Sequence, residues 1–149
     1  MTNATYHFST NSEHRLITCH PYLILLSRAV IQEVDFTVVC GWRGQNAQDT
    51  AVETGHSKVT WPSSKHNHML GCEPYSLAID VAPYDHVARA ILWDDVESFA
   101  LLAGYFKAVA FAKGIELRWG HDWNNNNILS DEAGKLIDRP HLELVDVER

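Results

Sequence analysis

Two short segments place a carboxylate and an imidazole where they could bind a metal ion. From Ser76 to Val81, polar or small residues alternate with aliphatic ones, so Asp80 lies on the face opposite the aliphatic side chains. From His141 to Val145 the same alternation separates His141 from its aliphatic neighbours. If the two strands are neighbours, both side chains point into one cleft. Carboxylates and imidazoles are common ligands of catalytic zinc, so the pattern indicates metal-assisted chemistry.

Each of these residues also has an ordinary structural interpretation. Asp80 could cap a turn at Pro83, and Asp138 could be a turn residue before Pro140. The sequence has nine histidines, and most histidines in proteins are surface or capping residues. Cys72 lies near the first segment, but no histidine spacing typical of a thiol protease accompanies it. The residue pattern alone therefore leaves the metal site as a hypothesis.

The elements that must position these residues indicate an α+β fold. Apolar residues at helical spacing predict one helix over Ser12–Val34, bent at Pro21, and a second helix that Asp94 or Asp95 caps. A short helix is expected near Gln45–Thr54. Because strands and helices mix without regular βαβ alternation, we predict a small, mainly antiparallel sheet flanked by helices. Its strands are expected at Phe36–Cys40, Ser76–Val81, Ile115–Trp119 and His141–Val145.

Length and composition narrow the range of functions. The 149 residues suit one domain spanning 1–149, which we expect to be monomeric. The formal charge of −7, with no basic stripe, argues against a nucleic-acid partner. No secretion signal is apparent, and the apolar stretches are shorter than the ~20 residues that cross a bilayer, so no stable membrane association is expected. The three cysteines have no metal-type spacing and fit free thiols made in a reducing cytoplasm: Cys19, Cys40 and Cys72.

Four motifs, kept in order along the chain, carry a family resemblance. They are Ser64-Lys-His-Asn67, Ser76-Leu-Ala-Ile-Asp-Val-Ala-Pro-Tyr84, Leu117-Arg-Trp-Gly-His-Asp-Trp123 and Asp138-Arg-Pro-His-Leu-Glu-Leu144. With them the chain resembles the zinc D-Ala-D-Ala carboxypeptidase and L-alanyl-D-glutamate endopeptidase family, above all its phage endolysin branch. The resemblance extends from about Leu16 to Leu144 and implies a Hedgehog/DD-peptidase-like fold.

The resemblance implies a zinc site and its catalytic residues. His66, Asp80 and His141 match the metal ligands of the family and leave a fourth tetrahedral position for water. Asp138 matches the general base, and Arg43 matches an arginine near the reaction centre that would stabilise an oxyanion or hold a carboxylate.

Further residues have less direct matches. We expect substrate contacts from Gln48, Ser76, His121 and Trp123, whereas Glu143 is expected to support the metal site from outside.

The sequence departs from the family between the first two ligands. In the family, the first ligand histidine and the ligand aspartate are usually seven to nine residues apart. Here an insert that includes His68–Tyr75 separates His66 from Asp80. His68 is an alternative first ligand. His66 is favoured because it alone stands in the Ser-Lys-His-Asn context.

These matches predict a zinc peptidase that cuts peptide bonds of bacterial peptidoglycan. We expect a phage endolysin that cuts L-Ala-D-Glu, is made in the host cytoplasm without a signal peptide, and reaches the wall after the membrane is permeabilised. The alternatives are a D-Ala-D-Ala carboxypeptidase and a non-catalytic zinc-containing binding module on the same fold. Retention of Asp138 and Arg43 argues against the binding module, because a structural zinc site needs neither a base nor an oxyanion partner.

Overall fold

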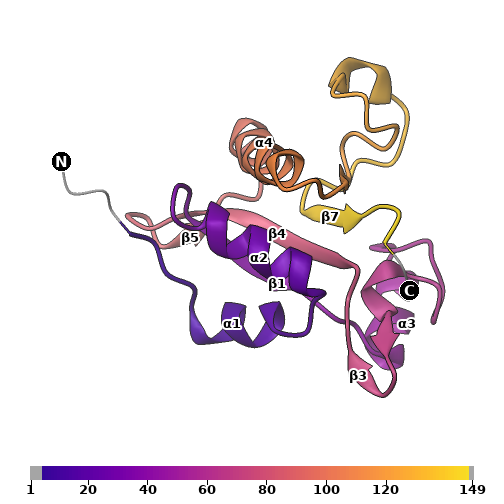
Figure 1. Ribbon diagram of the computed structural model, residues 1–149. Coiled ribbons are helices and arrows are strands. Elements are labelled where there is room, and N and C mark those ends of the chain that lie inside the picture. Colours follow the sequence, from indigo (N-terminus) through magenta and orange to yellow (C-terminus); the bar gives the residue numbers. More distant parts are fainter. Residues whose placement is uncertain (1–4, 148–149) are drawn as a thin grey trace.

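An antiparallel sheet forms the centre of the molecule (Figure 1). The computed structural model describes residues 5–147, so both ends of the predicted 1–149 domain lie outside the described residues. The strand order is β1-β4-β7-β6, and the short β5 pairs with one end of β4. The prediction of an α+β fold is confirmed. The strand bounds are β1 (Phe36–Cys40), β4 (Ala78–Asp85), β5 (Ala90–Ile91), β6 (Leu117–Trp119) and β7 (His141–Leu144).

Four helices accompany the sheet within the described residues: α1 (Thr10–Leu16), α2 (Pro21–Val30), α3 (Gln45–Glu53) and α4 (Val96–Ala112). Asp95 caps α4 as predicted, because its carboxylate accepts a hydrogen bond from the backbone N–H of Ser98 at 3.0 Å. Gly114, with φ +70°, ends the following turn. The helix predicted near Gln45–Thr54 is also present as α3.

The prediction of one bent helix over Ser12–Val34 is wrong, because the chain forms two separate helices there. His20 precedes Pro21 and adopts a ψ of 142°, which lies outside the helical region. The freed backbone pairs instead with Ser76, which donates to the Thr18 carbonyl at 3.0 Å and accepts from the His20 N–H at 2.8 Å. The break thus ties the N-terminal helices to the chain that enters β4.

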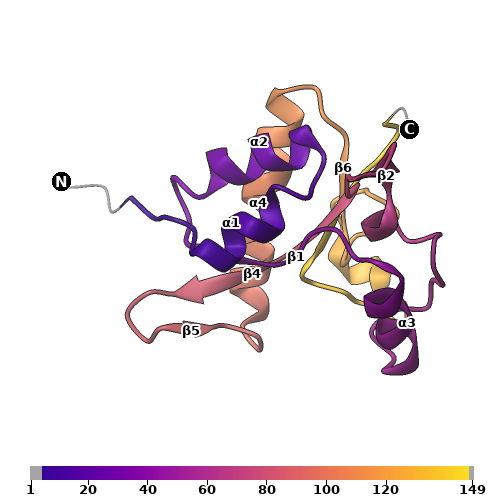
Figure 2. The ribbon, with the colours of Figure 1, turned by 90° about the horizontal axis from the view of Figure 1, so that it is seen from below.

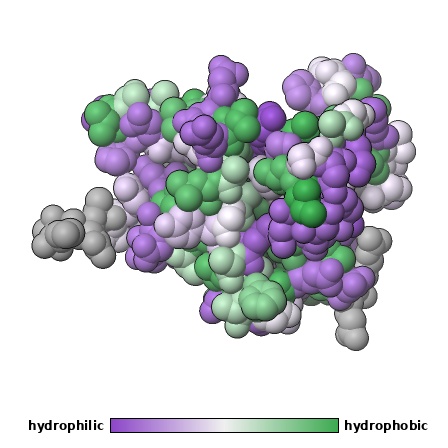
Figure 3. Space-filling model, turned by 90° about the horizontal axis from the view of Figure 1, so that it is seen from above, coloured by the Kyte–Doolittle hydropathy of each residue, from purple (hydrophilic) through white to green (hydrophobic). Residues whose placement is uncertain are grey.

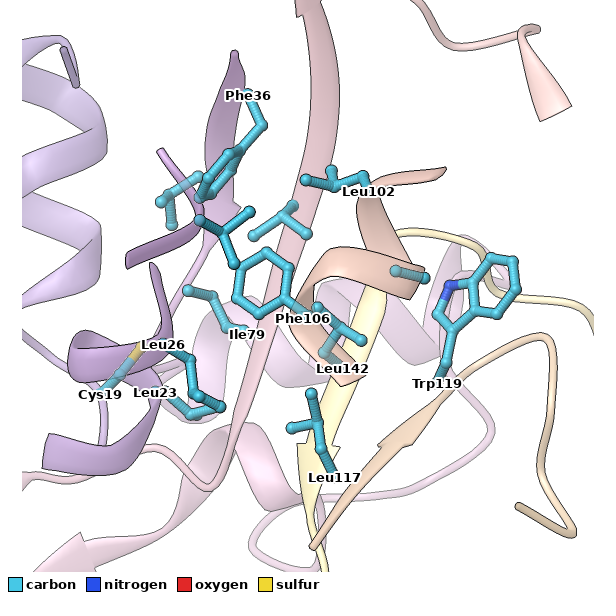
Figure 4. Packing of buried hydrophobic residues seen from close by; sticks show 14 of the residues in the cluster. Cys19, Leu23, Leu26, Phe36, Ile79, Leu102, Phe106, Leu117, Trp119 and Leu142 are labelled. Carbon is cyan, nitrogen blue, oxygen red and sulfur yellow. The ribbon is translucent and has the colours of Figure 1, made fainter. Parts of the chain in front are cut away.

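The hydrophobic core lies between the sheet and the packed pair α2 and α4. Figure 4 shows Phe106 of α4 in the middle of this cluster, with Ile79 of β4 and Leu142 of β7 close by. All three are almost completely buried. Since full burial of a large apolar side chain stabilises a fold by about 1.5–3 kcal/mol, this layer holds β4 and β7 in a fixed register.

A β-bulge interrupts the pairing of β1 with β4. Val38 is opposite Val81, but the register shifts after it and Cys40 is opposite Asp80. Val38 points into the core, whereas Cys40 lines a cavity on the other side of the sheet. Bulges re-aim side chains in this way, and they are frequent next to active sites.

The insert between the first two predicted ligands forms a small hairpin. Its strands are β2 (Met69–Leu70) and β3 (Glu73–Pro74), and Gly71 takes φ +62° at the turn. A short 3-10 helix, η1 (Lys65–Asn67), precedes it. The hairpin is therefore a compact excursion that leaves both of its ends close to the sheet.

A second long excursion, residues 120–140, follows β6 and contains the 3-10 helix η2 (Leu129–Glu132). Its asparagine-rich part is organised around the buried carboxylate of Asp122, which accepts from the Lys107 ammonium at 2.9 Å and from the Asn127 N–H at 2.9 Å. The excursion returns the chain to β7.

Within residues 5–147 no helix has the length and apolar character needed to cross a bilayer. On the face in Figure 3, apolar side chains are interspersed with hydrophilic ones.

Candidate metal centre and active site

Three predicted ligands converge on the face of the sheet opposite the core. Asp80 in β4 and His141 in β7 are direct cross-strand partners, and His66 arrives from η1. Asp80 Oδ1 is 3.3 Å from His66 Nε2 and 3.3 Å from His141 Nδ1, and the two nitrogens are 3.3 Å apart. The three atoms thus form an almost equilateral triangle.

Each imidazole is oriented by a hydrogen bond on its other nitrogen. His66 Nδ1 is 2.8 Å from the Gly41 carbonyl, and His141 Nε2 is 2.9 Å from Glu143 Oε1. Because both partners only accept, these ring nitrogens carry protons, and the other two ring nitrogens face Asp80. Metal-binding histidines are typically held by such outer partners.

The carboxylate at the centre is incompletely satisfied by protein groups. Asp80 Oδ1 is buried and makes no well-aligned hydrogen bond within the described residues. Although burial opposes a charged imidazole, the charge of Asp80 raises the pKa of His66 to about 10. In turn, despite burial, the nearby imidazoles hold the pKa of Asp80 well below its usual range. The site therefore attracts positive charge, which a proton or a metal cation can supply.

Glu143 connects the site to a second group of charges. Its Oε2 accepts from Arg118 Nη2 at 2.8 Å and from Lys65 Nζ at 3.0 Å, while its Oε1 accepts from His141. Although burial favours the neutral form, these hydrogen bonds keep the pKa of Glu143 well below its ordinary value. A charged Glu143 fixes the orientation of His141.

Cys40 also lies within reach of a metal ion. Cys40, His66 and Asp80 each offer one ligand atom, and these atoms lie within 4.8 Å of one another, so the group could hold a metal ion. Regular alternation in β1 would place Cys40 beside Val38 on the core side, and the bulge reverses this. Cys40 is therefore a residue that sequence reasoning missed, since no local signal marked the bulge.

Asp138 lies beside the three predicted ligands but is not itself a predicted ligand. Its backbone N–H donates to the Gly120 carbonyl at 2.7 Å, and its carbonyl accepts from the His141 N–H at 3.1 Å. A Cβ atom at Gly120 would be 2.1 Å from the Asp138 carbonyl oxygen, so only glycine permits this approach. Burial, and then the charge of Asp80, raises the pKa of Asp138.

Arg43 reaches the site from the loop after β1. Its Nη1 donates to Gln48 Oε1 at 3.0 Å, and its Nη2 is 3.5 Å from Asp80 Oδ2. Gln48 in turn donates to the Val59 carbonyl at 2.6 Å. The guanidinium is thus held beside the predicted ligands by α3 and the loop that follows it.

A cavity of ≈ 770 Å³, here called the cleft, opens over these residues. All the predicted metal and catalytic residues line it, together with the predicted substrate contact Trp123: Arg43, His66, Asp80, Asp138 and His141. The ring of Trp123 lies 5.6 Å from that of His141. The structure therefore brings the predicted site together in one accessible place.

The other three predicted substrate contacts do not line the cleft in the described part of the chain. Gln48 and Ser76 are completely buried and make internal contacts in this structure, so their contact with a substrate stays a prediction. The Ser76 hydroxyl bonds to the Ala78 carbonyl at 2.5 Å. The ring of His121 lies 5.1 Å from that of Trp119. Alternation along one strand could not reveal that Ser76 lies under the N-terminal helices.

The alternative ligand His68 lies elsewhere. Its ring lies 6.1 Å from that of Tyr75, at the start and end of the inserted hairpin, whereas His66 approaches Asp80 and His141. The geometry thus favours His66.

Comparisons with known proteins agree with this fold and show the family of the chain. The family model described as phage L-alanyl-D-glutamate peptidase matches residues 4–145. The chain belongs to that family, and the predicted peptidase activity on peptidoglycan is confirmed at this level. A relative, the L-alanyl-D-glutamate peptidase of Escherichia phage T5, is 36% identical over 146 residues, which cover 95% of this chain and 99% of the relative. The crystal structure of the Serratia marcescens L-Ala D-Glu endopeptidase ChiX is similar, with a TM-score of 0.71 and 25% identity over 95% of this chain and 92% of that one.

Proposed function

We propose that this peptidase is a zinc enzyme whose metal ligands are His66, Asp80 and His141. The triangle of 3.3 Å distances carries the proposal. Tetrahedral zinc with bonds of about 2.0–2.2 Å to nitrogen and oxygen sets its ligand atoms roughly 3.3–3.6 Å apart. Two imidazoles and a carboxylate are also a usual donor set of catalytic zinc, because they leave one position open.

Cys40 is the competing donor, and its sulfur also contacts groups outside the triangle. Cys40 Sγ lies 3.5 Å from the Gly41 carbonyl oxygen and 3.8 Å from Arg43 Nη2. His141 Nδ1 instead lies 3.3 Å from each of the other two ligand atoms, and Glu143 fixes its ring. These contacts support His141 over Cys40 as the third ligand.

The protein groups around the metal fit peptide hydrolysis. Bound zinc would lower the pKa of a coordinated water towards ~7 and polarise the scissile carbonyl. Asp138 accepts the proton of the attacking water and returns it to the leaving amine, a task that its raised pKa favours. Arg43 stabilises the negative charge that develops on the carbonyl oxygen.

We further propose that the scissile bond is the L-Ala-D-Glu bond of the peptidoglycan stem peptide. The names of the matched family and of both relatives support this choice over a D-Ala-D-Ala carboxypeptidase. The cleft residues Asp138 and Arg43 support an enzyme over a zinc-containing binding module. In this proposal the protein acts as a monomer, after its passage from the host cytoplasm through a permeabilised membrane.

The test is mass analysis of fragments that zinc-loaded protein releases from purified peptidoglycan. New D-Glu amino termini support the proposal. Release of terminal D-Ala alone would establish the carboxypeptidase, and binding without cleavage would establish the binding module. Elemental analysis should give one zinc per chain, and a value near zero after refolding with zinc would refute the proposed site.

A further inference from the structure

An exposed tryptophan stands at the rim of the cleft, away from the residues assigned above. Trp93 lies between β5 and α4, lines the cleft, and is 52% exposed. Its ring lies 6.5 Å from the ring of Phe99, at an interplanar angle of 32°, and Phe99 belongs to the core. The indole is thus anchored from inside and still accessible from the cleft.

The backbone places Trp93 beside one end of β4. The N–H of Leu92 donates to the Pro83 carbonyl at 2.9 Å, so Trp93 begins beside that part of β4. Pro83 and the ligand Asp80 are three residues apart on this strand, or roughly 10 Å at about 3.3 Å a residue. Figures 1 and 2 show β5 and α3 at opposite ends of β4.

The α3 end of the cleft has a different character. Lys58 lies in the loop after α3, is exposed and lines the cleft, and Arg43 is held on the same side by Gln48 of α3. In a chain of formal charge −7, two cations on one wall of a cleft favour an anionic part of the substrate. Trp93 thus lies at one end of the cleft and the cation Lys58 at the other.

The two halves of a stem peptide differ in the same way. On the acyl side of the L-Ala-D-Glu bond, L-Ala is joined through a lactyl group to an uncharged amino sugar. On the amine side, D-Glu and the residues after it carry free carboxylates. L-Ala and the lactyl group together span about two residue lengths, roughly 7 Å. A sugar ring beyond them is then separated from the scissile bond by a length similar to the roughly 10 Å of β4 between Asp80 and the strand position beside Trp93.

Building on the proposed function, we propose that Trp93 is the subsite for the sugar ring of the acyl half and that Lys58 faces the acidic leaving half. The stem peptide then binds in a single direction, with the glycan strand at the β5 end. The C–H face of a pyranose packs on an indole face, which is a large, rigid apolar surface. The charge of Lys58 pairs with the α-carboxylate of D-Glu.

The experiment compares two substrates that share one scissile bond. One is a disaccharide stem peptide, and the other is the same peptide with an acetyl group in place of sugar and lactyl. Trp93→Ala should lower kcat/KM about tenfold on the disaccharide substrate, mainly through KM, and leave the acetyl peptide unchanged. Trp93→Phe should retain most of the activity. Phe111→Ala, which removes an aromatic ring 88% exposed and outside the cleft, is the matched control.

A separate variant tests the direction in which the stem peptide binds. Lys58→Met should lower kcat/KM several-fold on the D-Glu substrate and have no effect when that α-carboxylate is amidated. Equal losses on both members of either substrate pair, or no loss in Trp93→Ala, would overturn the inference. If wild-type protein cleaves neither substrate at L-Ala-D-Glu, the proposed function itself fails. If it cleaves both equally well, the bond assignment stands and only the sugar subsite is lost.

Discussion

The two faces of the central sheet differ sharply although the same strands build them. On the face towards α2 and α4, β4 and β7 contribute buried aliphatic side chains to the core, among them Ile79 and Leu142. On the other face, alternate residues of the same strands are Asp80, His141 and Glu143. Buried charges destabilise a fold unless they are paired, so the apolar face must fix the register that pairs them. One face of the sheet therefore stabilises the fold, and the other carries the residues proposed for metal binding and catalysis.

The largest expected effect comes from removing a ligand on the chemical face. Asp80→Ala and His141→Ala should lose both zinc and activity while keeping the fold, because the three donors act as one site. Elemental analysis measures bound zinc, release of wall fragments measures activity, and circular dichroism checks the fold.

Two variants serve as controls for this prediction. Leu142→Ala, one residue from His141 on the apolar face, should keep zinc but lose about 2–5 kcal/mol of unfolding free energy. His68→Ala should keep zinc and activity. Loss of zinc in His68→Ala with retention in His66→Ala would move the first ligand into the inserted hairpin.

The next effect separates binding from chemistry on the same face. Asp138→Ala should keep zinc and thermal stability but lose at least about two orders of magnitude in turnover, the usual scale for loss of a general base. Bound zinc, unfolding temperature and fragment release are measured on one preparation. Full activity in this variant would show that another carboxylate is the base.

A smaller effect is expected from Glu143, which contacts a ligand from outside. Glu143→Ala should weaken zinc affinity about 10–100-fold, because His141 loses its hydrogen-bond partner. Competition with a chelator measures the affinity, and turnover with saturating zinc should change much less than in Asp138→Ala. An unchanged affinity would contradict the positioning role.

The smallest effect is a displacement of the pH profile. A base works only when it is deprotonated, and burial raises the pKa of Asp138. Turnover should therefore fall on acidification at a higher pH than the ~3.9 of an ordinary aspartate. The pH dependence of kcat with saturating zinc tests this, and an acid limb in the ordinary range would exclude Asp138 as the titrating group.

The sequence by itself determined what depends on short-range pattern. Alternation in the segments around Asp80 and His141 predicted their faces, and the adjacent cap candidates Asp94 and Asp95 marked the start of α4. The ordered motifs also pointed to the family. These signals are local, because the period of a strand and the chemistry of a cap involve residues a few positions apart.

Only the tertiary structure decided which loops meet and which side chains reach the cleft. The bulge after Val38 turns Cys40 towards Asp80, and docking of the N-terminal helices buries Ser76. Trp93 joins the cleft because β5 folds back along β4. Register, burial and approach depend on partners distant in the sequence, so no short-range pattern could encode them.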